Sequence, residues 1–307
     1  MKPAIHAARR PGLIVTADDF GLHPAINEAV EIAHTRGILT AASLMVAGPA
    51  VEDAVGRARR LPRLRVGLHL VLADGPAALK PDQIPGLVGP SGRFGNRMAW
   101  DGARFFFLPS VRRQLESEIR AQFQAYAATG LALDHVNAHK HFHLHPTVLG
   151  LILRVGREFG RPAVRIPAEP GGPSFLRPWL ALMRWRLKAA GVGHNDRVFG
   201  LRHSGRMTET ALLDSLSRVR DGLTEVYLHP ATISGAAIAP TMAGYRHADE
   251  LAALLSPAVR LAADRLNLPR GGYSDFASIR PSQPGTVMPG APAETGKIQR
   301  PPEGVAS

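Results

Sequence analysis

The sequence predicts an α/β fold in which helices surround a closed or nearly closed barrel of parallel strands. Short β-branched or apolar runs alternate with longer helical patterns, and no linker-like stretch divides the 307 residues. A third observation is that acidic and histidine side chains recur where the apolar runs end. A chain of this length can form one large domain with a sizeable core.

The predicted strands are the short apolar runs, and their alternation with helical patterns is the βα rhythm of a parallel sheet. In chain order these strands span Leu13–Ala17, Ala41–Ala47, Leu64–Leu72, Leu133–Asn137, Ala163–Ile166 and Glu225–Leu228.

The predicted helices carry suitable end residues. Pro24 and Pro146 suit first-turn positions, where a missing N–H costs nothing, and Gly130 and Gly191 suit helix ends. The helices are expected at Pro24–Thr35, Val51–Arg60, Val111–Thr129, Pro146–Phe159, Phe175–Ala190, Thr208–Arg220 and His247–Leu255.

Three segments lack such periodicity. Residues 75–102 are rich in Gly and Pro and are expected to form a long loop over one end of the barrel. Residues 277–307 are dominated by Pro, Gly, Ala and Ser, which predicts a disordered tail. With a flexible N-terminus at residues 1–11, the barrel domain is expected to span residues 12–276.

Composition narrows the function. There are no cysteines, which excludes disulfides, thiolate zinc sites and a cysteine nucleophile. No run is long enough for a membrane span, and the apolar run Leu13–Val15 is too short for a signal-peptide core, so a cytoplasmic location is expected. The net charge is +12, with a basic surplus between Arg154 and Arg206 that is either a solvated face or a surface for an anionic partner.

Acids and histidines lie at the carboxyl ends of the predicted strands. In a parallel barrel these ends meet at one rim, where catalytic groups sit. A carboxylate with two neutral imidazoles leaves open positions for water and substrate, as a catalytic metal site requires. Neighbouring strand residues point opposite ways, so one of the two aspartates is expected to bind metal and the other to act as base. The residues concerned are Asp18, Asp19, His69, His139, His141 and His229.

Each of these residues also has a structural interpretation. Asp18 and Asp19 are possible turn formers before Gly21, and His229 is a possible buried histidine at a loop start. Five histidines occur between His135 and His145, and period-two spacing would put three of them on one side if the chain stays extended. The histidine cluster indicates at least one metal ligand. The functional interpretation rests on the occurrence of the aspartates and the histidines together at the ends of the predicted strands.

The chain resembles the YdjC-like carbohydrate deacetylases along residues 12–276. A longer form of one segment, residues 134–146, and residues 200–207 resemble the hopanoid biosynthesis-associated branch, whose members deacetylate an N-acetylglucosaminyl hopanoid lipid. The segments that carry the family resemblance are Thr16-Ala17-Asp18-Asp19-Phe20-Gly21, Gly67-Leu68-His69-Leu70, His139-Lys140-His141-Phe142-His143 and Glu225-Val226-Tyr227-Leu228-His229-Pro230.

This resemblance implies a distorted TIM-like barrel and a hydrolase that removes acetyl from an N-acetylated sugar, with chitooligosaccharides or other N-acetyl glycans as alternative substrates. It implies one divalent metal on Asp19, His69 and His139, Asp18 as general base and His229 as general acid. The family's metal is Mg²⁺, whereas two imidazoles fit Zn²⁺ better. The residues expected to bind substrate are His141, His143, Arg165 and Glu169.

A lipid-linked substrate draws attention to the predicted helix at residues 175–190. Its apolar stripe and basic face are typical of either a helix lying on an anionic membrane or an ordinary barrel helix. The stripe consists of Leu176, Trp179, Leu180, Met183 and Leu187, and the basic face of Arg177, Arg184 and Lys188.

Three rival functions are weaker. An amidohydrolase would carry its His-x-His pair on the first strand, where this chain has Asp18-Asp19. A nucleic-acid-binding protein would exploit the net charge, but no helix-turn-helix or zinc finger accompanies it, so nucleic acid is not expected as a partner. A serine hydrolase is disfavoured because no Gly-x-Ser-x-Gly motif occurs.

Overall fold

A computed structural model describes residues 11–233 and 238–276. The predicted tail at residues 277–307 and all but Pro11 of the predicted N-terminal segment lie outside the described residues.

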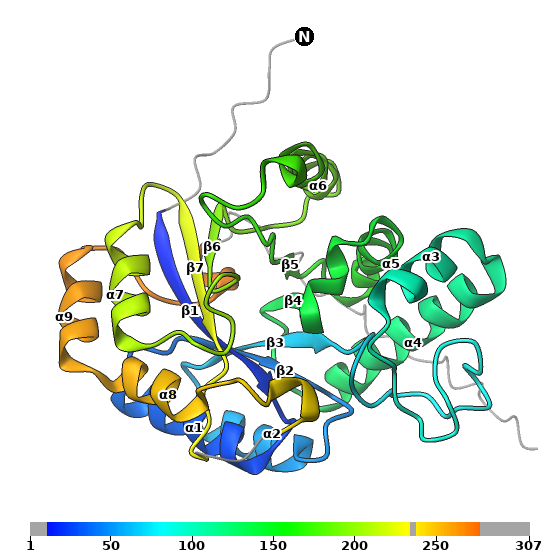
Figure 1. Ribbon diagram of the computed structural model, residues 1–307, viewed down its shortest axis with the longest axis horizontal. Coiled ribbons are helices and arrows are strands. Elements are labelled where there is room, and N and C mark those ends of the chain that lie inside the picture. Colours follow the sequence, from blue (N-terminus) through cyan, green and yellow to red (C-terminus); the bar gives the residue numbers. More distant parts are fainter. Residues whose placement is uncertain (1–10, 234–237, 277–307) are drawn as a thin grey trace, which may run out of the picture.

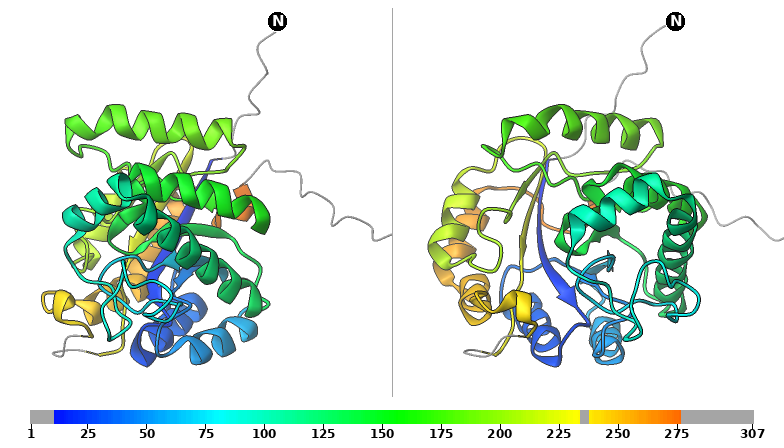
Figure 2. Two further views of the ribbon diagram at one scale, coloured as in Figure 1. Left: turned by 90° about the vertical axis from the view of Figure 1, so that its right-hand side faces the viewer. Right: turned by 45° about the vertical axis from the view of Figure 1, so that its right-hand side comes forward.

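The described chain forms one parallel sheet that curls around a central interior (Figures 1 and 2). Its order is β5-β4-β3-β2-β1-β7-β6. The strands are β1 (Gly12–Phe20), β2 (Ala41–Leu44), β3 (Arg65–Leu70), β4 (His135–Ala138), β5 (Ala163–Val164), β6 (Arg197–Phe199) and β7 (Leu223–Leu228).

The curled sheet stops short of closure. The edge strands β5 and β6 do not pair as strands, although the Val198 N–H donates to the Ala168 carbonyl at 3.1 Å and the Asn195 side chain binds the backbone of Ile166. This half-barrel confirms the predicted α/β, TIM-like fold. β6 was not predicted, and β1 extends past its predicted end to include Asp18 and Asp19.

Helices cover the outside of the sheet (Figure 1). The predicted helices are all present, α2 and α8 with the predicted ends and the others with shifted ends, whereas α3, α9 and α10 were not predicted. They are α1 (Pro24–Arg36), α2 (Val51–Arg60), α3 (Met98–Phe107), α4 (Pro109–Ala128), α5 (Pro146–Gly156), α6 (Arg177–Ala189), α7 (Glu209–Ser217), α8 (His247–Leu255), α9 (Pro257–Arg265) and α10 (Tyr273–Phe276), with 3-10 turns at His139–Leu144, Arg157–Phe159, Ser174–Leu176 and Pro240–Met242.

The structure corrects the predicted loop at residues 75–102 and decides between the two interpretations of the apolar stripe on α6. The predicted loop at residues 75–102 ends earlier, because α3 begins at Met98. The apolar stripe of α6 faces inward, since Met183 and Leu187 are buried and the Trp179 indole donates to the Leu144 carbonyl. The barrel-helix interpretation of this stripe is therefore correct. Among the described residues, no helix is both long and apolar enough to cross a membrane.

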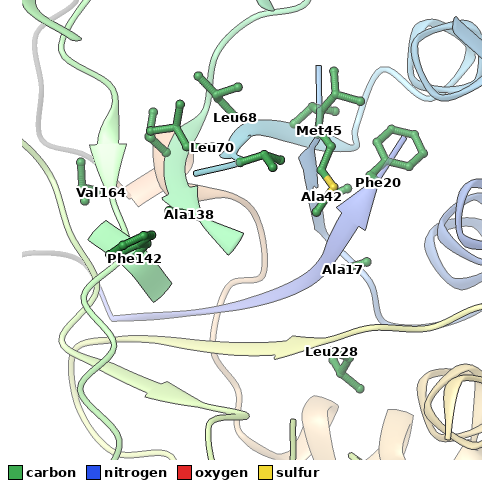
Figure 3. Close-up of a cluster of buried hydrophobic side chains, with 14 of the residues drawn as sticks. Ala17, Phe20, Ala42, Met45, Leu68, Leu70, Ala138, Phe142, Val164 and Leu228 are labelled. Carbon is green, nitrogen blue, oxygen red and sulfur yellow. The ribbon is translucent and has the colours of Figure 1, made fainter. Parts of the chain in front are cut away.

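Strand periodicity separates an apolar shell from a polar interior. Along β1, Leu13, Val15 and Ala17 join the main core between sheet and helices, part of which Figure 3 shows. The intervening Thr16 and Asp18 instead bind charged groups inside the barrel. The interior is closed at its base by a second apolar cluster, to which α10 contributes Tyr273 and Phe276.

The close approach of the His135 ring to β3 inside the barrel explains why residue 67 is a glycine. A Cβ on Gly67 of β3 would lie 2.5 Å from the ring of His135 on β4. Glycine therefore makes room for the buried His135, which binds Asp134 and Ser43 and so acts as a structural histidine.

Candidate metal centre and active site

Asp19, His69 and His139 converge at the carboxyl edge of the sheet. Asp19 Oδ1 lies 3.2 Å from His69 Nε2 and 3.0 Å from His139 Nδ1, and the two nitrogens are 3.4 Å apart. All three residues are buried, and they come from β1, from the end of β3 and from the residue after β4. The predicted ligand set is thus assembled as a possible metal-binding triad.

The triad fits a single divalent ion. Two ligand atoms that each lie about 2.1 Å from one ion are separated by roughly 3.0 to 3.4 Å in octahedral or tetrahedral arrangements. In addition, the second carboxylate oxygen of Asp19 is buried and has no hydrogen-bond partner. Because a buried carboxylate oxygen without a partner is costly, a cation at this point satisfies the geometry and the charge together.

Backbone conformation at the end of β1 explains how both aspartates reach this region. Asp19 has φ 64°, and the pairing of β1 with β2 shifts register between Ala17 and Phe20. This left-handed residue interrupts strand alternation, so both carboxylates reach the same group of side chains. The prediction that Asp18 and Asp19 point to opposite faces is therefore wrong.

Asn137 links the triad to Asp18. Its Oδ1 accepts from His69 Nδ1 at 2.6 Å, and its Nδ2 donates to Asp18 Oδ1 at 3.2 Å and to Ser43 Oγ at 2.9 Å. An amide oxygen only accepts, so His69 carries a proton on Nδ1, and Nε2 is the ring nitrogen that faces Asp19 and His139 and is placed to bind a metal. Asn137 thereby fixes the tautomer that a metal ligand needs.

We expect Asn137→Ala to weaken Zn²⁺ binding by roughly 10- to 100-fold, because His69 loses the partner that orients its ring. Competition with a chelating dye would measure the dissociation constant. Ser43→Ala is the matched control, since it removes a partner of Asn137 that does not touch His69. An unchanged dissociation constant in Asn137→Ala would show that Asn137 does not position the ligand.

Asp18 is held by a buried arginine. Arg165 NH1 lies 2.5 Å from Asp18 Oδ2, and the same guanidinium binds Glu225 from the opposite side. Burial favours a raised pKa for Asp18, but the charges of Arg165 and His69 outweigh it and hold that pKa well below its usual range. Asp18 is therefore ionised at every ordinary pH and fixed in direction.

His229 follows β7 and faces the same region. It is buried, and its backbone N–H donates to the carboxylate of Glu250 while its carbonyl binds His247 Nδ1 at 2.6 Å. Burial lowers the pKa of the His229 imidazole, against the opposing influence of Asp19 and Asp18. Its ring lies 5.6 Å from that of Tyr227, whose hydroxyl is 2.9 Å from His141 Nε2.

The histidine-rich segment turns sharply after His139. Lys140 and His141 have φ values of 52° and 55°, inside the 3-10 turn His139–Leu144. The chain does not stay extended here, so the condition under which period-two spacing would put three histidines on one side is not met, because two successive left-handed residues break the period of two. Only His139 of this segment joins the triad.

The predicted substrate-binding residues lie at different depths. His141 binds Tyr227, His143 and Arg165 are fully buried, and Glu169 is half-buried with its carboxylate accepting from the Arg202 N–H at 2.9 Å. The buried position of Arg165 between two carboxylates favours a role in holding Asp18. Direct substrate contacts of these residues stay a prediction.

His143 gives the fold a dependence on pH. Burial and the charge of Arg165 lower the pKa of His143 to about 3. Below about pH 6.5 the His143 imidazole binds a proton in the unfolded chain but stays neutral in the folded chain. The free energy of unfolding therefore falls as pH drops from about 6.5 towards 3.

We expect the free energy of unfolding to fall by about 2 kcal/mol between pH 7.5 and pH 5 because of the titration of His143. Urea denaturation of metal-free wild type and His143→Asn at both pH values would measure the two pH dependences. The wild type should lose more stability on acidification than the variant, and equal losses would contradict this assignment.

Sequence reasoning missed Asn137 and Tyr227. Each lies two residues before a predicted site histidine, on a strand whose alternate side chains enter the barrel. Counting back along each strand from His139 and His229 with a period of two would have indicated these partners.

A curled parallel sheet with an aspartate and two histidines at its carboxyl edge defines a TIM-like α/β protein with a candidate catalytic metal centre. The chain belongs to the family of YdjC-like proteins, whose model matches residues 12–265.

Relatives and a solved structure agree with this assignment. A carbohydrate deacetylase of Geobacillus stearothermophilus is 31% identical over 80% of this chain and 89% of its own length. The carbohydrate deacetylase of Homo sapiens is 30% identical over 89% of this chain and 94% of its own length. That of Brevibacillus brevis is 39% identical over 50% of this chain and 59% of its own length. An Enterococcus faecalis crystal structure, named for cellobiose-phosphate cleavage, is 24% identical with a TM-score of 0.71 over 87% of this chain and 99% of its own, and it supports the fold.

Proposed function

We propose that this protein is a metal-dependent hydrolase that removes the acetyl group from an N-acetylated amino sugar. The observation that carries the proposal is the convergence of Asp19, His69 and His139 at the rim, beside the ionised Asp18 and the buried His229. The naming of several relatives as carbohydrate deacetylases supports the same substrate class.

Asp19, His69 and His139 would hold one divalent ion, which when bound would polarise the acetamide carbonyl and acidify the attacking water. Two imidazole nitrogens and one carboxylate favour Zn²⁺, Co²⁺ or Ni²⁺ over Mg²⁺, which prefers oxygen ligands. Metal analysis of the purified protein, followed by reconstitution with each ion, tests this preference.

Proton transfers are the work of the chain's own residues. Asp18 accepts the proton of the water whose oxygen attacks the carbonyl carbon, and Arg165 keeps that carboxylate ionised and oriented. His229 delivers a proton to the nitrogen as the C–N bond breaks, so acetate and a free amino sugar leave. Tyr227 packs edge-on against His229 and holds the wall beside it.

Acetate release from N-acetylglucosamine, chitooligosaccharides and N-acetylglucosaminyl glycolipids tests the proposal, with mass spectrometry to detect loss of one acetyl group. Cyclic amides and ureas serve as the comparison for an amidohydrolase. Turnover of the cyclic substrates, without acetate release from any N-acetylated sugar, would contradict the deacetylase function.

The finer proposal is that the substrate is the N-acetylglucosaminyl group of a hopanoid lipid, met at the inner membrane face. Sequence resemblance over residues 134–146 and 200–207 supports it. So do exposed large apolar side chains on two segments, residues 100–108 and 175–185, which include Trp100, Phe107, Phe175 and Trp185. Exposed large apolar side chains such as these are typical of contact with another apolar phase.

Flotation with anionic liposomes tests the membrane contact. We expect the protein to float at low salt and Phe175→Ser with Trp185→Ser to reduce the floated fraction. Absence of binding at low salt would retire the membrane proposal and leave the deacetylase proposal standing, since chitooligosaccharides need no membrane.

A further inference from the structure

His229 lies at a point where the sheet no longer pairs its backbone. The register of β1 with β7 ends at the pair Ala17 and Leu228, and His229 is the next residue. His229 is buried, and a buried N–H or C=O outside a β-ladder needs another partner. The place of its imidazole therefore depends on the groups that bind the backbone of this residue.

Helix α8 supplies both of these groups. The Glu250 carboxylate accepts the His229 N–H through Oε2, and His247 Nδ1 lies 2.6 Å from the His229 carbonyl oxygen. Because a carbonyl oxygen only accepts, His247 carries a proton on Nδ1. Both side chains are buried, and residues three apart lie on the same face of a helix. The start of α8 thus binds His229 on both sides of its backbone.

Glu250 also binds a second segment of the rim. Its Oε1 accepts the Met207 N–H at 2.8 Å, beyond the loop that follows β6. Tyr245 packs on this loop, since a Cβ on Gly205 would lie 2.3 Å from the Tyr245 ring. The Tyr245 ring in turn lies 5.1 Å from that of His229. One buried carboxylate therefore joins the ends of two neighbouring βα loops, and the residue between them packs on the imidazole.

The imidazole of His229 has weaker restraints of its own. Its Nδ1 is buried and has no hydrogen-bond partner among the described residues. The ring is flanked by Tyr227 at 5.6 Å and Tyr245 at 5.1 Å, which restrict its rotation. Asp18 and Asp19 are close enough to raise its pKa against the effect of burial. A displaced backbone would therefore move the imidazole relative to both aspartates.

We propose that Glu250 and His247 are positioning residues for His229, the general acid of the deacetylation. The inference rests on the proposed function and adds the groups that set the place of the acid beside the triad. Glu250 and His247 act through the backbone of His229, which they bind at its N–H and its carbonyl. A general acid needs this precision, because a misplacement of about 1 Å can cost roughly 10²-fold in rate.

The test compares Glu250→Gln with Glu118→Gln. Glu118 is the matched control, because it is also a fully buried carboxylate that accepts two backbone N–H groups, those of Ala78 and Leu79. A glutamine has one acceptor oxygen instead of two, so Glu250→Gln cannot accept from both Met207 and His229 through separate oxygens. Burial raises the pKa of Glu250 to about 7, and assays at about pH 8.5 keep the wild-type carboxylate ionised.

The kinetic readout is acetate release by the Zn²⁺-loaded protein. The substrate is whichever of N-acetylglucosamine, chitooligosaccharides and N-acetylglucosaminyl glycolipids the wild type deacetylates fastest. We expect Glu250→Gln to lower kcat roughly 10- to 100-fold, while KM and the Zn²⁺ dissociation constant stay unchanged. Glu118→Gln should keep the wild-type kcat.

A positioning role further predicts that the loss depends on His229. In a His229→Ala background, Glu250→Gln should lower kcat by less than about threefold, because the group that it positions is already absent. His247→Phe is a second variant with the same expected pattern. It removes the donor to the His229 carbonyl and keeps a ring beside Tyr245, whose ring centroid lies 5.4 Å from that of His247.

Amide exchange, followed by nuclear magnetic resonance in the metal-free protein, measures the clamp without activity. We expect the amide of Met207 or of His229 to exchange at least about tenfold faster in Glu250→Gln than in the wild type, since one of them loses a charged acceptor. Both amides should keep the wild-type rate in Glu118→Gln.

Equal fractional losses of kcat in the wild-type and His229→Ala backgrounds would overturn the inference and leave the deacetylase function standing. The same holds for a loss of kcat in Glu118→Gln as large as in Glu250→Gln, or for Met207 and His229 amides that both keep the wild-type exchange rate in Glu250→Gln. If the Zn²⁺-loaded wild type released acetate from none of the N-acetylated substrates, the proposed function would fail, and this inference with it.

Discussion

Asp19→Asn is expected to remove the bound metal and to lower acetate release by more than about 10³-fold, since water without a metal keeps a pKa near 15.7 rather than about 7. Asp19 supplies the one carboxylate of the triad, and its Oδ1 is the atom nearest to both imidazoles. Asparagine tolerates the left-handed backbone at this position, so the variant should keep the end of β1 in place.

The measurement is metal content of the purified variant by elemental analysis, followed by the rate with saturating metal. Asp53→Asn, a carboxylate on α2 that binds Asn27 and Arg57, is the control for loss of one negative charge elsewhere. If Asp19→Asn kept one equivalent of metal and the wild-type rate, Asp19 would not be a ligand.

Asp18→Asn is expected to keep the metal and to lower kcat by roughly 10²- to 10⁴-fold, the range for loss of a positioned general base. The fold should survive, because Arg165 retains Glu225 as a charged partner. Metal retention is what separates this variant from Asp19→Asn, and the two together assign different tasks to neighbouring aspartates.

Glu225→Gln is the control for the buried ion-pair network. It also removes one carboxylate from Arg165, but from the side away from the triad, where Thr16 and Tyr273 bind Glu225. We expect lower stability in this variant and a much smaller loss of kcat. Equal losses of kcat in Asp18→Asn and Glu225→Gln would mean that Asp18 acts only through the network and not as a base.

The fold class was predictable because the strands carry apolar side chains that pack against the helices, and these short segments alternate with helical patterns along the chain. β6 was not predicted because Arg197–Phe199 begins with a charged residue and does not read as an apolar run. α10 escaped because one turn has no recognisable stripe, although its Tyr273 closes the barrel floor and binds Glu225.

The site was predictable in its ligands and not in its backbone. Rim positions after parallel strands indicated a wider group of candidate residues, because topology brings such positions together, and the family resemblance singled out Asp19, His69 and His139 as the ligands. The left-handed conformations of Asp19 and Lys140 follow from tertiary packing and leave no pattern in the residues around them. These conformations bring both aspartates into the site and leave His139 as the one histidine of the cluster that joins the triad.

Anomalous diffraction from crystals grown with Zn²⁺, recorded at the zinc absorption edge, tests most directly that three remote residues hold one ion. We expect one strong peak about 2.0 to 2.2 Å from Asp19 Oδ1, His69 Nε2 and His139 Nδ1. A fully zinc-loaded crystal whose only peaks lie elsewhere, with these three side chains still hydrogen-bonded to one another, would contradict it.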